Sequence, residues 1–456
     1  MTTQISAWEK HAGTDTALNA GNNAGKAPPY RLTNQLSMNV IYTLIVSSLF
    51  TVFFACQSRP VVKTESSSRE SPPFILGVDN FFQNYLYLVD GKRVGLLTNP
   101  SGVNRDLLAT SDLFQAHPAV TLTAFYGPEH GIRAAVFAGR TIADTLDEET
   151  GVPVYSLYGR NKKPSEAMLR NVDIIVVDIQ DIGLRAYTFI STMAMVMQAA
   201  AETDKEIIIL DRPNPLGGVR VEGNVLDQAF ASFVGLYPIP YLHGMTIGEL
   251  ALLFNNEFDI GCRLKVVPMK GWKRSMNWGD VNLVWIPTSP HVPTWQTIFY
   301  MGATGTLGEL GVLSTGVGYT TPFKLVGAPW INAKIFAAAL NDCALPGVYF
   351  RPVFFKPYYL HYKGEICQGV QLHITDWQIF SPYITGLKIM EIYSSIYPDH
   401  PLFANSERIE MFDKVVGTDQ IRKGLLDGIS AEQQQNKWQP VLNKFLVTRK
   451  KYLIYQ

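Results

Sequence analysis

The sequence predicts an α/β protein that begins with a doubly wound parallel sheet, and two patterns carry this prediction. Short apolar runs rich in β-branched residues recur at 93–98, 120–125, 173–178 and 206–210. Continuous apolar runs of this length are typical of parallel strands that are covered on both faces. Between the runs, apolar residues recur at steps of three and four, as in 107–114 and 189–200, which predicts helices. Strands and helices in alternation indicate right-handed crossovers between parallel strands.

Length and composition indicate a folded protein of more than one domain. At about 100 to 200 residues per domain, 456 residues correspond to two or three domains. The apolar share of 47% and the 24 Phe, 21 Tyr and 8 Trp residues are too high for a disordered chain. Lys and Arg together number 39, as do Asp and Glu, so no net charge attracts nucleic acid. We therefore expect no nucleic-acid partner.

The N-terminal stretch is typical of a targeting segment. Residues 40–55 contain no charged side chain and end just before Cys56. This run is shorter than the roughly 20 residues that cross a bilayer as a helix, and it matches the apolar region of a signal peptide. Ala55 before Cys56 predicts lipoprotein cleavage, with lipid on Cys56. Because residues 1–37 have no apolar periodicity and Met38 directly precedes the apolar run, we expect Met38 to be the true start. We expect an exported protein, lipid-anchored at a bacterial membrane and facing the periplasm. An uncleaved anchor helix and a soluble chain with an unusual N-terminus are the alternatives.

The pattern divides the chain at about residues 73 and 287. Residues 1–73 hold the over-extended start, the signal segment and a linker, and residues 74–287 hold the predicted sheet domain. From 288 to 456, Pro, Gly and aromatic residues replace the alternation, which predicts a smaller, mixed α/β C-terminal domain. Cys343 and Cys367 can pair in an oxidising compartment, and buried free thiols are the alternative.

The predicted site lies at the carboxyl ends of the strands, where open parallel sheets bind their ligands. Charged and amide side chains follow each predicted strand: Asn99, then Glu129 and His130, then Asp178, Gln180, Asp181 and Arg185, then Arg212 and Asn214. Turn formation explains part of this set, and solvated loops with internal salt bridges are the alternative to a site. Carboxylates, amides and arginines without a serine or cysteine nucleophile favour sugar chemistry, in which a carboxylic acid protonates a leaving oxygen.

Other kinds of site are weakly indicated. Gly302, Gly305 and Gly308 do not follow a strand in a βαβ unit, so we expect no nucleotide. The set His130, Asp178, Asp181 and His243 lacks the short spacings of metal ligands, so we expect no metal and no cofactor. The segment from Thr246 to Glu249 precedes an apolar run, which predicts a capping box rather than a catalytic glutamate. His243, just before this helix, is a candidate to face the site.

Five motifs in consistent order resemble those of a known family. They are Gly127-Pro128-Glu129-His130-Gly131, Ser156-Leu157-Tyr158-Gly159, Asp178-Ile179-Gln180-Asp181-Ile182-Gly183 with Arg185 and Tyr187, Asp211-Arg212-Pro213-Asn214-Pro215, and His243-Gly244-Met245-Thr246-Ile247-Gly248-Glu249-Leu250. Over residues 74–400 the chain resembles the exo-β-N-acetylmuramidases, peptidoglycan-recycling glycosidases. The resemblance implies a Rossmann-like N-terminal domain, a C-terminal domain that closes a cleft, and release of terminal N-acetylmuramic acid.

The resemblance also implies roles for individual residues. Its catalytic glutamate falls on Glu129, as the residue pattern also suggests. Asp178 and Asp181 are further catalytic candidates, and Gln180 is a substrate-binding candidate that would position sugar hydroxyls or water. We expect Arg185 or Arg212 to hold the lactyl carboxylate of the sugar in a bidentate contact. The other substrate-binding candidates are Asn99, His130, Tyr187, Asn214 and His243. A non-catalytic muropeptide-binding lipoprotein and a metal-dependent hydrolase are the alternative functions.

The chain departs from the family pattern at two places. Ser314-Thr315-Gly316-Val317-Gly318 stands where many members have Ser-Glu-Gly-Arg-Gly, so one acid and one arginine are missing. His291 stands where an asparagine is common. Because the Pro-Glu-His-Gly motif is kept, these departures predict a change in substrate preference rather than a loss of activity.

Overall fold

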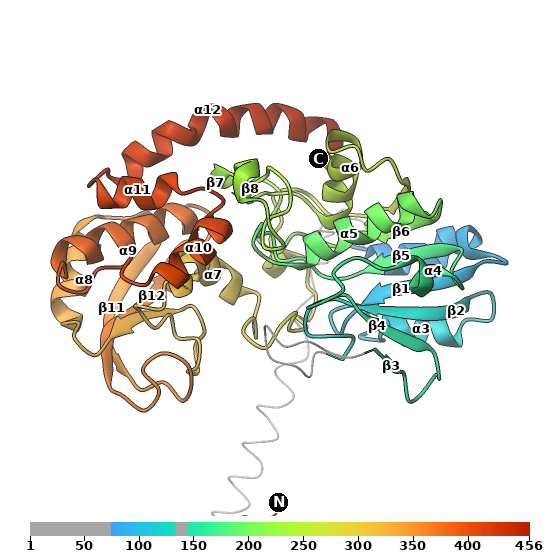
Figure 1. Ribbon diagram of the computed structural model, residues 1–456, viewed down its shortest axis with the longest axis horizontal. Coiled ribbons are helices and arrows are strands. Elements are labelled where there is room, and N and C mark those ends of the chain that lie inside the picture. The colour runs from blue at the N-terminus through green and yellow to red at the C-terminus, as the bar shows by residue number, and fades with distance from the viewer. Residues whose placement is uncertain (1–73, 134–143) are drawn as a thin grey trace, which may run out of the picture. The chain divides into compact units, whose positions relative to one another are not determined.

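The computed structural model describes residues 74–133 and 144–456, and Met38 and Cys56 lie outside these ranges. A seven-stranded sheet forms the N-terminal region (Figure 1). Its strands, in spatial order, are β3 (Thr145–Leu146), β4 (Pro153–Ser156), β2 (Thr121–Gly127), β1 (Arg93–Thr98), β5 (Ile174–Asp178), β6 (Glu206–Leu210) and β9 (Arg263–Val267). All neighbours pair in parallel except β3 with β4. The predicted parallel sheet is confirmed.

The strand order places a topological switch point between β1 and β5. The chain runs outward from β1 through β2 to β4, then returns to lay β5 against the other side of β1. Thr98 of β1 pairs with Asp178 of β5 at the carboxyl end of this crevice. Ligands of doubly wound sheets bind at such a point, because the loops on its two sides diverge.

Two cores cover the sheet, because successive strand residues face opposite sides. Ile175 and Val177 face the core that includes α5 (Phe189–Glu202) and α6 (Ile247–Glu257). Ile174 and Val176 face the core on the other side, with Phe114 of α3 (Thr110–Ala116). The whole of β5 is buried, which explains why its sequence is an uninterrupted apolar run.

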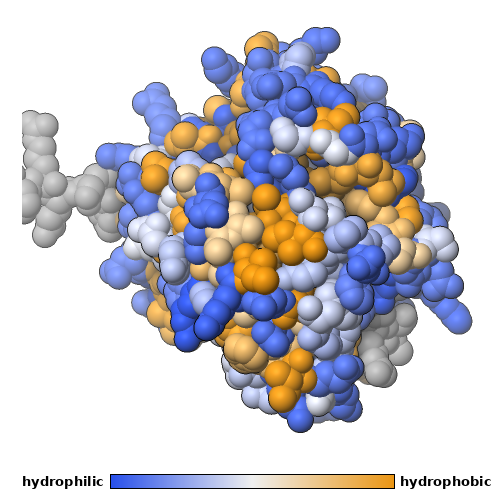
Figure 2. Space-filling view, turned by 90° about the vertical axis from the view of Figure 1, so that its left-hand side faces the viewer, coloured by the Kyte–Doolittle hydropathy of each residue, from blue (hydrophilic) through white to orange (hydrophobic). Residues whose placement is uncertain are grey.

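A second, mixed α/β region follows, as the sequence predicts. Its antiparallel sheet has the order β10 (Leu325–Ala328), β12 (Cys367–Ile374), β11 (Val348–Phe355). The helices of this region are α7 (Gln296–Glu309), α8 (Ala333–Asp342), α9 (Pro382–Ile396), α10 (Ser406–Val416), α11 (Gln420–Leu426) and α12 (Ala431–Arg449). The face shown in Figure 2 carries apolar side chains in patches among hydrophilic ones.

Helix α12 links the two regions. It packs on α9 and on β7 (Glu222–Val225), which pairs with β8 (Pro240–Leu242). Figure 1 shows α12 running from above α11 toward α6, so the last residues return to the N-terminal region.

Two expectations from the sequence concern the cysteines and a membrane-spanning helix. Cys343 and Cys367 are free thiols, so the disulfide considered for them is wrong. The alternative of buried free thiols holds for Cys367, whereas Cys343 is only partly buried. Over 74–133 and 144–456, no helix combines the length and apolar character needed to cross a bilayer.

Candidate active site

Glu129 lies in the turn that follows β2. The Gly131 amide donates to the Pro128 carbonyl over 2.9 Å, and His130 and Gly131 both have positive φ, 73° and 75°. This tight turn leaves the Glu129 side chain half-buried. Thr188 Oγ1 donates to Glu129 Oε2 over 2.8 Å. The Tyr158 hydroxyl is also hydrogen-bonded to Glu129, and burial together with the nearby carboxylate raises the pKa of Tyr158 to about 12. Two hydroxyls therefore hold the carboxyl in place.

Asp181 and His243 form a buried pair after β5 and β8. His243 Nε2 lies 3.2 Å from Asp181 Oδ2, which also accepts a 2.7 Å bond from the Gly183 amide. The Met245 amide donates to His243 Nδ1 over 3.2 Å, so a neutral ring carries its proton on Nε2. Both side chains are almost fully buried. The imidazole can therefore donate toward Asp181 or toward a ligand beside it.

Several buried polar atoms at this edge of the sheet lack a hydrogen-bond partner among the described residues. They are Asn99 Nδ2, Ser156 Oγ, Gln180 Oε1 and Asp181 Oδ1. His243 Nε2 has its 3.2 Å contact with Asp181 Oδ2 but makes no hydrogen bond within the described ranges. Unsatisfied buried polar atoms are rare and costly in folded proteins, and a polar ligand or water at the site would pair them. These atoms come from the ends of β1, β4, β5 and β8, so separate segments converge on one region.

Tyr187 connects this region to the segment before α7. Its hydroxyl donates to Thr288 Oγ1 over 2.8 Å. Burial raises its pKa well above the ordinary value, and the charges of Asp181 and Glu129 add to the shift. Tyr187 is thus close to both carboxylates and keeps its proton.

Two cavities lie beside the Glu129 turn. One, of about 510 Å³, is lined by residues that include His130, Arg133 and Ser156, and the other, of about 450 Å³, includes Asn99 and Arg133. Such volumes suit a small ligand. Glu129 itself lines neither cavity, although Gly127, His130 and Gly131 around it line the larger one.

The two predicted carboxylate-binding arginines are engaged inside the protein. Arg212 Nε lies 2.5 Å from Asp178 Oδ1, and its Nη2 lies 2.8 Å from Asp178 Oδ2. Asp178 also accepts a bond from Thr110, and both members of the pair are buried. The alternative to a site was solvated loops with internal salt bridges, and this ion pair is internal but buried rather than solvated. It favours a structural role for Asp178 and Arg212.

Arg185 and Asn214 also bind backbone groups. The Arg185 guanidinium donates to the carbonyls of Asn224, Ile239 and Val416 over 2.8, 2.8 and 2.5 Å, and burial lowers its pKa to about 10. The Asn214 side chain donates to the Met245 carbonyl and accepts from the Leu216 amide. These contacts favour structural roles for Arg185 and Asn214. Of the predicted site residues, Glu129, Tyr187, Asp181 and His243 lie near one another, whereas the Arg185 guanidinium points to backbone carbonyls elsewhere.

Sequence reasoning did not select four other residues that the structure brings to the site. Tyr158 and Thr188 bind Glu129, and Ser156 and Arg133 line the larger cavity. Ser156 and Tyr158 belong to the motif Ser156-Leu157-Tyr158-Gly159, which directly follows an apolar segment. Their place after that segment is the sequence signal that could have indicated the site. Arg133 follows Glu129 by four residues in the same loop.

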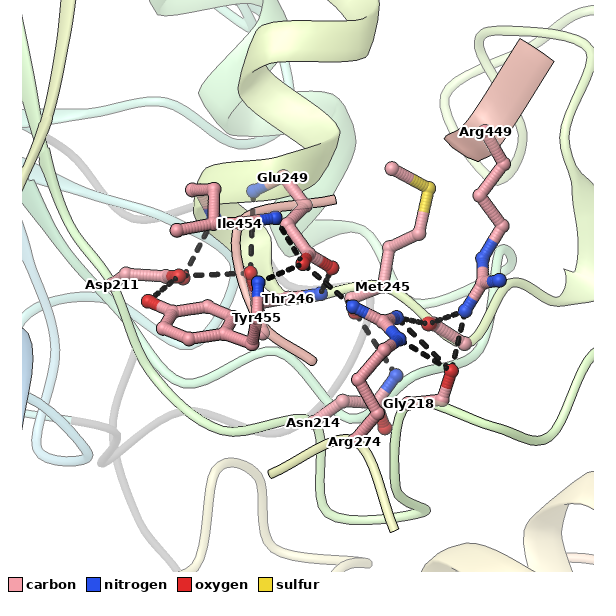
Figure 3. Close-up of polar contacts among 12 residues, drawn as sticks. Asp211, Asn214, Gly218, Met245, Thr246, Glu249, Arg274, Arg449, Ile454 and Tyr455 are labelled. Carbon is pink, nitrogen blue, oxygen red and sulfur yellow. Dashed lines mark hydrogen bonds and ion pairs between the residues drawn. The ribbon is translucent and has the colours of Figure 1, made fainter. Parts of the chain in front are cut away.

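A second buried cluster joins the C-terminal tail to the N-terminal region (Figure 3). Thr246 and Glu249 form the predicted capping box at the start of α6, which confirms that interpretation. Glu249 Oε1 accepts from Arg274 Nη1 over 2.6 Å and from the Ile454 amide over 2.9 Å. The Tyr455 hydroxyl donates to Asp211 Oδ2 over 2.6 Å. Burial raises the pKa of Asp211 to about 7.

Metal binding was also considered. Within the described ranges, no group of three or more His, Cys, Asp or Glu side chains is arranged to hold a metal ion.

The chain resembles known proteins along most of its length. The family models "Exo-beta-N-acetylmuramidase NamZ, N-terminal" and "Exo-beta-N-acetylmuramidase NamZ, C-terminal" match residues 94–296 and 298–455. The peptidoglycan beta-N-acetylmuramidase NamZ of Bacillus subtilis (strain 168) is 44% identical over 407 residues, covering 89% of this chain and 97% of that protein.

Two crystal structures of DUF1343 family proteins from Bacteroides fragilis NCTC 9343 are also similar. One has a TM-score of 0.81 and 44% identity, the other a TM-score of 0.68 and 30% identity, and each match covers 84% of this chain and 99% of the other. The fold, the motifs and these relatives agree, and the chain belongs to the exo-β-N-acetylmuramidase family of glycoside hydrolases.

Proposed function

We propose that this chain is an exo-acting β-N-acetylmuramidase that releases terminal N-acetylmuramic acid from the non-reducing end of peptidoglycan fragments. Glu129 is its general acid. Family membership supports the reaction, because the Bacillus subtilis relative is named for it. One observation supports the assignment of Glu129: a half-buried carboxyl, held by Thr188 and Tyr158, stands at the sheet edge where buried polar atoms lack protein partners in the described ranges.

Glu129 protonates the glycosidic oxygen as its bond to the sugar breaks. The proton leaves a carboxyl oxygen of Glu129, and positive charge develops at the anomeric carbon of the sugar. Water then forms a bond to this carbon and releases one proton, which balances the proton that Glu129 gave. Thr188 and Tyr158 then donate to the carboxylate that remains, so its position is kept between turnovers. Fixed geometry of this kind lowers the entropic part of the barrier.

Asp181 and His243 bind the polar groups of the sugar or an incoming water. Asp181 Oδ1 is a buried acceptor, and His243 Nε2 is a buried donor. A substrate hydroxyl, an acetamido group or water offers the complementary donor and acceptor. The pair therefore positions the reacting groups rather than supplying the first proton.

Arg133 is the arginine that we assign to the lactyl carboxylate. Its side chain is 60% exposed and lines both cavities, in contrast to the buried guanidinium groups of Arg185 and Arg212. Its Nη2 lies 2.8 Å from Asp147 Oδ2 and 3.4 Å from Glu149 Oε2, and both acidic residues also line the two cavities. A planar guanidinium suits a carboxylate ligand.

A turnover assay with a chromogenic N-acetylmuramide tests the function. Glu129→Gln should lower kcat by about 10² to 10⁴-fold without loss of folding. Glu166→Gln on α4 (Glu166–Leu169) is the matched control, because this glutamate is exposed. Binding without turnover in the parent would instead support a muropeptide-binding protein, and loss of activity with chelators would support a metal-dependent hydrolase.

We also propose that the protein is exported and lipid-anchored through Cys56. The uncharged run 40–55 before Cys56 supports this. Metabolic labelling with a fatty acid should mark the parent in a bacterial host, and Cys56→Ser should abolish the label. An unlabelled parent found outside the membrane fraction would contradict the proposal.

A further inference from the structure

The segment from Thr288 to His291 lies against the candidate active site. Thr288 accepts the hydroxyl of Tyr187, which is close to Glu129. Tyr187 directly precedes Thr188, whose hydroxyl donates to Glu129. Because His291 follows Thr288 by three residues, it stands at one border of the region around the proposed acid. Burial lowers the pKa of His291, and His130 lowers it further.

Tyr359 reaches this border from the C-terminal region. It belongs to the connection between β11 and β12, and its hydroxyl lies 2.6 Å from His291 Nε2. The two rings stack with centroids 6.2 Å apart and planes 25° apart. Through Tyr359, the C-terminal region therefore contacts the segment from Thr288 to His291.

The backbone holds this connection in place. The Tyr358 amide donates to the Gly318 carbonyl over 2.7 Å, and the Gly364 amide donates to the Pro357 carbonyl over 2.9 Å. Gly318 has a φ of 93°, and a Cβ there would lie 2.2 Å from the Tyr359 carbonyl oxygen. Only glycine permits this close approach, so the position of Tyr359 is set by the fold.

The same connection exposes consecutive large apolar side chains. Tyr358, Tyr359 and Leu360 are 62%, 38% and 55% exposed. The Tyr359 hydroxyl is used by His291, so the part of the side chain left for a ligand is its ring. Aromatic rings present wide apolar faces at low conformational cost, and ligand sites combine such faces with a few polar groups.

We propose that Tyr359, held by His291, forms an aromatic wall that binds the leaving-group sugar of the substrate. The proposal rests on the proposed function and adds the subsite beyond the scissile bond. An exo-acting enzyme encloses the terminal sugar and leaves the remainder of the fragment open to solvent. The buried polar atoms near Asp181 suit the enclosed sugar, and the exposed ring suits the carbon face of the next one.

Two substrates separate this role from a general one. The first is the disaccharide of N-acetylmuramic acid linked β-1,4 to N-acetylglucosamine, and the second is methyl β-N-acetylmuramide, which lacks a leaving-group sugar. Tyr359→Ala should lower the ratio of the two kcat/KM values by about tenfold. Tyr359→Phe keeps the ring but loses the bond to His291, so its ratio should lie between those of the parent and Tyr359→Ala.

Tyr349→Ala is the matched control. This tyrosine is 53% exposed, but it lies near the start of β11, about 20 Å along the strand from the end that leads to Tyr359. Its ratio should equal that of the parent. An equal loss on both substrates, or no loss on either, with Tyr359→Ala would overturn the leaving-group role.

Calorimetry with Glu129→Gln separates failure of this inference from failure of the proposed function. The disaccharide should bind about tenfold more weakly when Tyr359→Ala is added to Glu129→Gln. If the parent turns over neither substrate but the two variants differ in affinity as expected, the proposed reaction is wrong and the aromatic wall is supported. If the parent is active and the two affinities are equal, the wall fails alone.

Discussion

Thr188 Oγ1 donates to Glu129 Oε2 over 2.8 Å, although Thr188 is the N-cap residue of α5. An N-cap threonine ordinarily bonds an amide of the first helical turn, but this one makes no such bond. The hydroxyl bonds the carboxyl that we assign as the acid instead of a helix amide. It therefore holds the proposed acid in position and does not stabilise the start of α5.

Thr188→Val should therefore reduce activity more than stability. We expect kcat/KM on the chromogenic N-acetylmuramide to fall about tenfold, because a hydrogen bond to a carboxyl is lost. The free energy of unfolding should change by less than about 1 kcal/mol, because no cap is removed. Thr188→Ser should restore most of the activity. A large loss of stability with unchanged kcat/KM would contradict this view.

Arg212→Ala should mainly destabilise the protein. It leaves Asp178 buried without its bidentate partner, which costs about 3 to 5 kcal/mol in comparable pairs. Denaturant unfolding measures this loss. A variant that stays as stable as the parent but shows a raised KM would instead restore Arg212 to the role of a substrate ligand. Arg160→Ala, which removes an exposed arginine, serves as the control.

Arg133→Gln should change sugar selectivity. We expect KM for the N-acetylmuramide to rise about tenfold, because a charge-assisted contact to the lactyl carboxylate is lost. Activity on the matching N-acetylglucosaminide, which lacks this carboxylate, is the internal reference. Equal changes on both substrates would show that Arg133 does not read the carboxylate.

Asp211 should make the protein less stable as the pH rises from about 4 to 7. Its ordinary pKa is 3.8, and burial raises it to about 7 in the folded protein. Over this interval the folded state keeps a proton that the unfolded chain has released, so the free energy of unfolding falls with pH. The slope from one such group reaches about 1.4 kcal/mol per pH unit.

Unfolding of Asp211→Asn at several pH values isolates this contribution. The variant cannot ionise at residue 211, so its stability should depend less on pH between 5 and 7 than that of the parent. Other partly buried carboxyls with a raised pKa, such as Glu222 and Glu309, remain in both proteins and cancel in the comparison. Identical slopes would assign the pH dependence to those groups.

Much of the sheet could be predicted because its central strands are covered on both faces. The runs 93–98 and 206–210 match β1 and β6, whose residues are almost all buried. β4 and β9 were not predicted. In β4, buried and partly buried residues alternate. In β9, the exposed Arg263 and Lys265 alternate with the partly buried Leu264 and Val266. β9 is an edge strand and β4 lies next to the two-residue edge strand β3, so both are only partly covered and their sequences lose the continuous apolar pattern.

Only part of the site could be predicted, because the sequence indicates where strands end but not which groups a side chain bonds. Strand ends place Glu129, Asp181 and Gln180 at one edge, and this follows from topology alone. The partners of an arginine do not follow from topology. Arg185 bonds the carbonyl of Val416, 231 residues away, and backbone carbonyls leave no signal in the sequence.

The Arg185 guanidinium also has a calorimetric consequence. Nη1 of the guanidinium binds carbonyls before residue 287, and Nη2 binds carbonyls after residue 410. If either the N-terminal or the C-terminal region unfolded alone, this buried cation would lose half of its hydrogen-bond partners. Heating should therefore give one endotherm whose van't Hoff and calorimetric enthalpies agree, as expected of an all-or-none transition.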